Sequence, residues 1–143
     1  MRLTVVTCTW LSLACTGPKD QPGQTGSTSS QPPITDRDWV LVSLGEQSSP
    51  VGRDKQPATL RLDASANRAA GFAGCNRYSA SYTLTADSLR FGPAVATKMA
   101  CVEGDELERH YLGALPVVAT YEVTDSSLIL KGPDGPLARF RAR

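Results

Sequence analysis

The sequence predicts an α+β fold in which a curved, mostly antiparallel β-sheet or open barrel packs against one main α-helix. Many short apolar segments, separated by turn residues, indicate strands, and residues 78–84 show the clearest alternation of apolar and polar side chains. One segment, residues 105–115, has helical spacing instead. A length of 143 residues fits a single domain of ordinary size.

The strand predictions follow from local patterning. We expect strands at residues 39–44, 59–62, 69–75, 78–84, 89–91, 120–123, 128–130 and 137–140. The first of these is continuously apolar, which predicts burial on both faces. The sequence Gly-Pro-Asp-Gly at 132–135 is typical of a turn and joins the last two strands.

The single predicted helix has an acidic beginning. Asp105 and Glu108 have the spacing of a capping box, with aspartate as the cap. Four apolar side chains fall on one face of this helix: Leu107, Tyr111, Leu112 and Leu115. Pro116 lies where the helix should end.

Composition excludes several classes of protein. Fifteen lysines and arginines nearly balance 14 acidic residues, which gives a net charge of +1, so we expect no nucleic-acid partner. No apolar run reaches the roughly 18 residues of a spanning helix. There is one histidine, and neither a zinc-site spacing nor a phosphate-binding glycine loop occurs, so we expect no metal and no cofactor.

Residues 1–15 predict an export signal, with Arg2 before a mostly apolar stretch. Leu11-Ser12-Leu13-Ala14-Cys15 resembles a bacterial lipobox. The resemblance implies that Cys15 carries lipid and anchors the chain to a membrane of the cell envelope, either in the outer membrane or facing the periplasm. A plain cleaved signal or a misassigned start codon is the alternative. Residues 16–36 are rich in Gly, Pro, Ser, Thr and Gln and predict a flexible tether, leaving 37–143 as the folded domain.

Two further cysteines lie in the predicted domain, Cys75 and Cys101. In an oxidising compartment two cysteines of a small domain usually pair, which would stabilise the fold by roughly 3 kcal/mol. Free buried thiols and a reactive cysteine are the alternatives, although the CxxC spacing of redox sites is absent.

Two motifs carry a resemblance to a known family. Residues 71–82, GFAGCNRYSASY, resemble the central motif of META domains, the HslJ-like family, and Phe91-Gly92-Pro93 with residues 97–101, TKMAC, resembles the second. The resemblance covers residues 38–141. It implies a secreted or lipoprotein-borne domain linked to heat-shock response, antibiotic tolerance or motility, and it brings no established reaction or cofactor.

Several polar residues are candidates for binding. Asn76 and Arg77 form either a ligand-contacting pair or, as we favour for Asn76, a local set of backbone hydrogen bonds. Arg139, Arg141 and Arg143 alternate, so they share one side of a strand. They suit lipid phosphates or an acidic partner, or they protect an edge strand from pairing, which we favour.

Three functions remain open. The first is a non-catalytic envelope lipoprotein that acts in envelope stress or antibiotic tolerance by binding a protein or an envelope component. The second is an assembly chaperone or pilot lipoprotein for an outer-membrane complex, holding a peptide in a groove or at a sheet edge. The third is a cysteine-dependent enzyme, in which His110 activates Cys75 or the acidic residues of the helix act as acid and base. We favour the first.

Overall fold

The computed structural model describes residues 32–143. The predicted export signal, the lipid-accepting Cys15 and most of the predicted tether lie outside the described residues. The end of the predicted tether is within the described residues. Ile34 there is buried, and its carbonyl accepts a hydrogen bond from the Trp39 indole at 2.9 Å. The packed domain therefore begins at Ile34, slightly ahead of residue 37.

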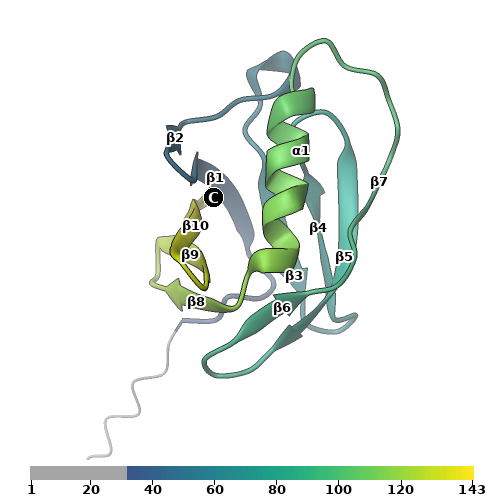
Figure 1. The fold of residues 1–143 in the computed structure, drawn as a ribbon. Coiled ribbons are helices and arrows are strands. Elements are labelled where there is room, and N and C mark those ends of the chain that lie inside the picture. Colours follow the sequence, from purple (N-terminus) through teal and green to yellow (C-terminus); the bar gives the residue numbers. More distant parts are fainter. Residues whose placement is uncertain (1–31) are drawn as a thin grey trace, which may run out of the picture.

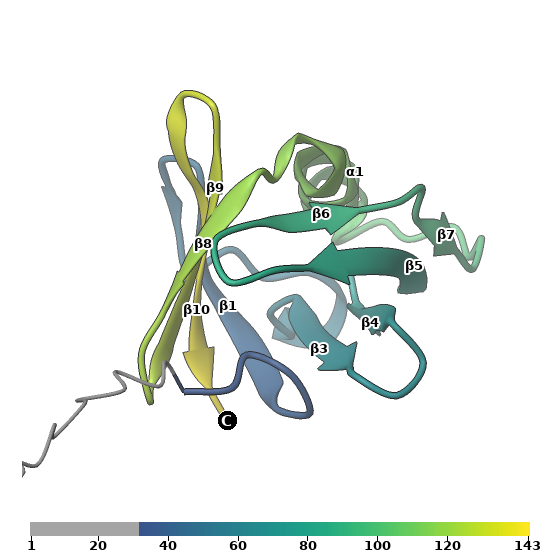
Figure 2. The same cartoon turned by 90° about the horizontal axis from the view of Figure 1, so that it is seen from below.

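An antiparallel sheet curves into a nearly closed barrel, and one main helix packs against it (Figures 1 and 2). The strands are β1 (Asp38–Leu44), β2 (Gln47–Ser48), β3 (Thr59–Asp63), β4 (Arg68–Phe72), β5 (Arg77–Leu84), β6 (Leu89–Phe91), β7 (Val95–Ala96), β8 (Thr120–Val123), β9 (Ser127–Gly132) and β10 (Gly135–Ala142). The helix is α1 (Asp105–Ala114), and two short 3₁₀ turns are η1 (Arg53–Lys55) and η2 (Leu115–Val117). The predicted fold class is confirmed.

The strand order is β6-β5-β4-β3-β1-β10-β9-β8, with β2 beside β1 and β7 beside β5. The first and last strands of this order approach each other at a seam, where Ser88 bridges Thr120 and the Leu89 N–H donates to the Ala119 carbonyl at 3.2 Å. The sheet is thus nearly closed, and the first and last strands of the described residues, β1 and β10, are neighbours.

The barrel interior is filled by side chains from the strands and from one face of α1. Leu107, Tyr111 and Leu115 of this helical region are buried against Trp39 and Phe140 of the sheet. Four aromatic side chains of the strands are also buried: Trp39, Tyr78, Tyr82 and Phe91. Burial of this apolar surface is the main stabilising contribution.

The continuous apolar run of β1 is explained by its position. Trp39 and Leu41 face the interior, whereas Val40 lies on the opposite face and is still only 6% exposed. Side chains and loops on the outer surface, including Pro57 and Arg141, surround Val40. The prediction that this strand is buried on both faces holds for Val40 and is wrong for Val42, which is 40% exposed.

Candidate functional site

The turn between β4 and β5 carries the bonded cysteine pair. Cys75 is 1% exposed and is joined to Cys101, with Cα atoms 5.9 Å apart. Cys101 belongs to the loop that connects β7 to α1, so the bond fastens this loop to the central turn. The predicted disulfide is confirmed in the structure.

Asn76 is the only buried polar residue in the described chain. Its side-chain amide donates to the Met99 carbonyl at 3.3 Å and to Glu108 Oε1 at 3.0 Å. Its Oδ1 accepts from the Met99 N–H at 2.9 Å and the Thr97 hydroxyl at 3.1 Å. The hydrogen bonds of the Asn76 side chain are therefore structural, but the prediction that its partners are local is wrong: Thr97, Met99 and Glu108 lie 21 to 32 positions further along the chain. Asn76 holds the 97–101 loop beside the disulfide.

Glu108 completes this cluster from the helix. Its Oε2 accepts the backbone N–H groups of Asn76, at 2.5 Å, and Cys75, at 3.3 Å. One carboxylate thus receives three donors from the turn, because Oε1 also accepts the Asn76 amide. Charge-assisted bonds of this kind are stronger than neutral ones.

The predicted capping box is wrong. The residue that caps α1 is Gly104, with φ of +92°, and no side chain bonds to the helix N-terminus. A Cβ on Gly104 would lie 2.2 Å from the Gly74 carbonyl oxygen, so only glycine allows this approach. Asp105 instead pairs with Arg109 at 3.0 Å on the exposed side of the helix, and Glu108 turns towards the cysteines.

The remaining groups of the catalytic hypothesis are dispersed. His110 is exposed on α1, while Cys75 is buried and bonded. Within residues 32–143 no three His, Cys, Asp or Glu side chains gather closely enough to hold a metal ion.

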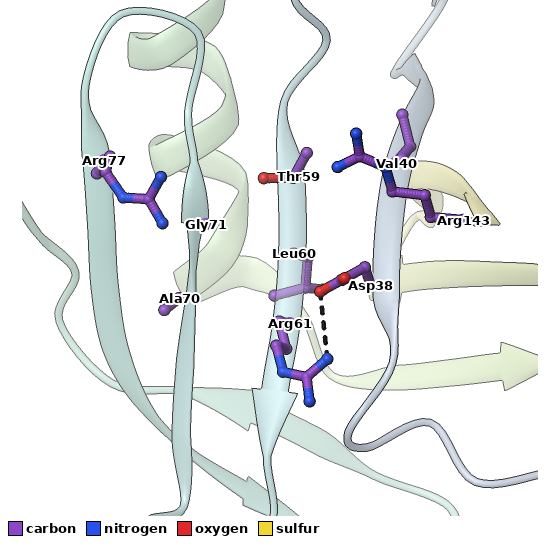
Figure 3. Close-up of a pocket in the computed structure, with 9 residues that line it drawn as sticks. All are labelled: Asp38, Val40, Thr59, Leu60, Arg61, Ala70, Gly71, Arg77 and Arg143. Atoms are coloured by element: carbon purple, nitrogen blue, oxygen red, sulfur yellow. Dashed lines mark hydrogen bonds and ion pairs between the residues drawn. The ribbon is translucent and has the colours of Figure 1, made fainter.

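The side chains of Asn76 and Arg77 are separated, one buried beneath the turn and one exposed, and do not form one ligand-contacting pair. Asn76 points to the interior cluster, and Arg77, at the start of β5, is exposed and lines a hollow on the outer face (Figure 3). This hollow has a volume of 230 Å³. Its lining residues are Asp38, Val40, Thr59, Leu60, Arg61, Ala70, Gly71, Arg77 and Arg143.

Arg139 and Arg141 of β10 share the outer face, as predicted, because they are exposed and alternate with the buried Ala138 and Phe140. Their interpretation as protection of an edge strand is wrong: β10 pairs with β1 on one side and β9 on the other. Arg141 and Arg143 line a second hollow of 410 Å³ with Val40, Gln56, Pro57 and Thr59. Arg139 lies one alternation further along the same face.

Sequence reasoning missed Thr59 and Arg61 as members of this surface. Their alternation around Leu60 shows that they share a face. The strand order that brings them between Arg77 and Arg143 depends on long-range pairing of β1 with β3 and β10. No local pattern reveals that order.

The comparisons with known proteins agree with the fold. The model of the META domain family matches residues 32–143, so the chain belongs to the META domain family. A solved structure of a protein from Burkholderia xenovorans is similar, with a TM-score of 0.64 and 32% identity over 77% of this chain and 83% of that chain.

A second protein of known structure has a TM-score of 0.58 and 23% identity, covering 76% of this chain and 90% of that chain, and shows the same fold. The search of curated proteins finds no match. Among the described residues no helix has the length and apolar character to cross a membrane.

Proposed function

We propose that this protein is a non-catalytic lipoprotein of the cell envelope whose META domain binds a protein or an envelope component during envelope stress or antibiotic exposure. The observation that carries the proposal is the use of the central motif for cohesion. Cys75 is bonded to Cys101, and the polar atoms of Asn76 are all engaged by Glu108, Met99 and Thr97.

The proposed location rests on the N-terminal sequence. A lipobox-like run ends at Cys15, and a polar segment follows it before the domain begins. Such a segment gives a folded domain reach from a membrane surface. The disulfide fits an oxidising compartment.

The two alternatives receive less support. A pilot that holds a peptide inside the barrel needs an open interior, and the interior is packed by Trp39, Tyr111 and Phe140. A cysteine-dependent enzyme needs a free thiolate, and Cys75 is oxidised and buried.

The location is tested in the native host. Mass spectrometry of the mature protein should find a diacylglyceryl-modified Cys15 at the N-terminus, and the protein should fractionate with membranes. Cys15→Ser should move it to the soluble fraction. An unmodified N-terminus elsewhere in a soluble protein would refute the anchor.

The binding role is tested by complementation. Deleting the gene should lower survival on heating or antibiotic exposure, and the wild-type gene should restore it. His110→Gln should restore survival fully, since we assign that residue no chemistry. In-cell crosslinking from the tethered domain should then capture a defined envelope protein or component that is absent with Cys15→Ser. Loss of survival with His110→Gln, at normal protein level, would contradict a non-catalytic role.

A further inference from the structure

The outer face of the sheet contains a hollow bounded by arginines from separate parts of the chain. Figure 3 shows Arg77 extending from β5 on one side and Arg143 from the end of β10 on the other. Their guanidinium groups point into the same hollow, above Gly71 and Thr59. The adjoining hollow shares Arg143 and Thr59 and adds Arg141.

The floor of the hollow is open because its residues are small. Ala70 of β4 presents only a methyl group on this face, and Gly71 lines the hollow with its backbone. Gly71 cannot be enlarged, since a Cβ there would lie 2.0 Å from the Thr59 carbonyl oxygen. The arginines therefore border a depression with backbone and a hydroxyl at its base.

Thr59 supplies that hydroxyl. Its Oγ1 accepts the Phe72 N–H at 3.0 Å, which fixes its position. A hydroxyl also has one hydrogen to donate, and no acceptor for it is found in the described chain. A polar group entering the hollow therefore meets an oriented donor as well as the arginines.

The charges of the hollow are unbalanced. Three arginines and one aspartate line it, which gives three positive charges minus one negative charge, or +2. Asp38 pairs with Arg61 at 3.3 Å. The ion pairs formed within residues 32–143 involve neither Arg77 nor Arg143.

Edge protection does not explain this excess charge, because β1, β3, β4 and β10 are all interior strands of the sheet. Two like charges directed into one hollow repel each other, and an anion placed between them removes that repulsion. The guanidinium fork matches phosphate oxygens bidentately.

We propose that this hollow binds a phosphomonoester group, held between Arg77 and Arg143 with the Thr59 hydroxyl as a third donor. A phosphomonoester carries about −1.5 to −2 charges at neutral pH and three acceptor oxygens, so it can accept from both guanidinium groups and from the Thr59 hydroxyl, whereas a carboxylate has two oxygens. The oxygens of a phosphate are arranged tetrahedrally, so they can accept hydrogen bonds from two guanidinium groups that approach from opposite sides. The phosphate belongs either to a lipid headgroup or to a soluble phosphorylated compound. The inference deepens the proposed binding function and rests on it for the envelope origin of the ligand.

The test is a titration of the isotopically labelled full chain with inorganic phosphate at constant ionic strength, followed by NMR. The amide signals of Thr59, Gly71 and Arg77 should move together. Arg77→Gln and Arg143→Gln should each weaken binding by about tenfold. Arg77→Lys should weaken it less, because charge remains and the fork is lost.

Arg90→Gln is the matched control, since Arg90 is an exposed arginine on β6 that lines neither hollow. It should bind phosphate as the wild type does. An absence of hollow-specific shifts in the folded wild type, or equal weakening by Arg90→Gln, would overturn the proposal.

Sedimentation with phosphatidylcholine vesicles, with and without phosphatidic acid, distinguishes a lipid headgroup from a soluble phosphorylated compound as the source of the phosphate. Arg77-dependent sedimentation with phosphatidic acid assigns a lipid headgroup. Phosphate binding in solution without such sedimentation assigns a soluble phosphorylated compound. These measurements are independent of Cys15 modification and of survival in cells, so the phosphate site and the proposed function can fail separately.

Discussion

The Glu108 carboxylate accepts both the backbone N–H and the side-chain amide of Asn76. This pair joins α1 to the turn before β5 and lies beside the disulfide. A residue of the helix and a residue 32 positions earlier in the chain thus form one hydrogen-bonded unit. The consequence is that changes at either residue should affect folding before they affect any surface.

Glu108→Ala should lower the free energy of unfolding by about 2–3 kcal/mol, because it leaves the N–H groups of Cys75 and Asn76 without their acceptor. Glu108→Gln should cost less, since its amide oxygen still accepts one bond. Urea unfolding measures both. Glu106→Ala, at an exposed position of the same helix, is the control and should change stability little. Equal losses at Glu106 and Glu108 would contradict the assigned role.

Asn76→Asp should destabilise the domain strongly at neutral pH, because a second carboxylate would then face Glu108 in a buried site. Protonation of one of the two carboxyl groups removes the repulsion, so the variant should approach wild-type stability as the pH falls below neutrality. Unfolding midpoints measured from pH 7 downwards test this. A deficit that is independent of pH would indicate a loss of shape alone.

Iodoacetamide should leave Cys75 and Cys101 unlabelled in the native, unreduced chain, since both sulfurs are bonded to each other. Peptide mapping by mass spectrometry distinguishes them from the cysteines near the N-terminus. The double variant Cys75→Ala/Cys101→Ala should lose roughly 3 kcal/mol of stability. Labelling of Cys75 in the unreduced chain would restore the nucleophile hypothesis.

The buried tyrosine pair should make the domain sensitive to alkali. The hydroxyls of Tyr78 and Tyr111 lie 2.8 Å apart, and burial raises the pKa of both above the ordinary value of 10.0. Above that pH the unfolded chain releases protons that the folded chain retains, so stability should fall as the pH rises. Below pH 10 these residues should contribute no pH dependence.

Urea unfolding at pH 8 and pH 10.5 measures the effect. Tyr78→Phe should reduce the alkaline loss, because one of the two titrating hydroxyls is removed. Tyr121→Phe is the control, since the Tyr121 hydroxyl bonds to Thr85 and Ala86 carbonyls at the surface. An unchanged alkaline loss in Tyr78→Phe would mean that other groups cause it.

Much of the fold is predictable from local pattern. Residues 78–84 alternate because one face of β5 is buried, and the structure starts this strand one residue earlier. The predicted strand at 69–75 ends sooner, at Phe72, because Ala73–Asn76 form the turn that carries the disulfide. The strands β2 and β7 are not predicted, because two residues are too few to show an alternation of apolar and polar side chains.

The candidate site is predictable only in part. The cysteine pair follows from compartment and domain size, but the capping box fails because Glu108 serves a distant turn instead of its own helix. The arginines of β10 look like edge protection until the pairing with both neighbours is known. The partner of Glu108 and the neighbours of β10 are set by contacts between residues far apart in the chain. The spacing of residues within one segment does not reveal such contacts.

The position of β1 has a mechanical consequence. The first strand of the domain, β1, begins at Asp38 and is flanked by β3 on one side and β10 on the other. A pull on the preceding segment therefore loads two ladders of backbone hydrogen bonds in shear at once, instead of peeling a strand from a free margin. A domain built this way resists tension from its N-terminal side through both ladders together.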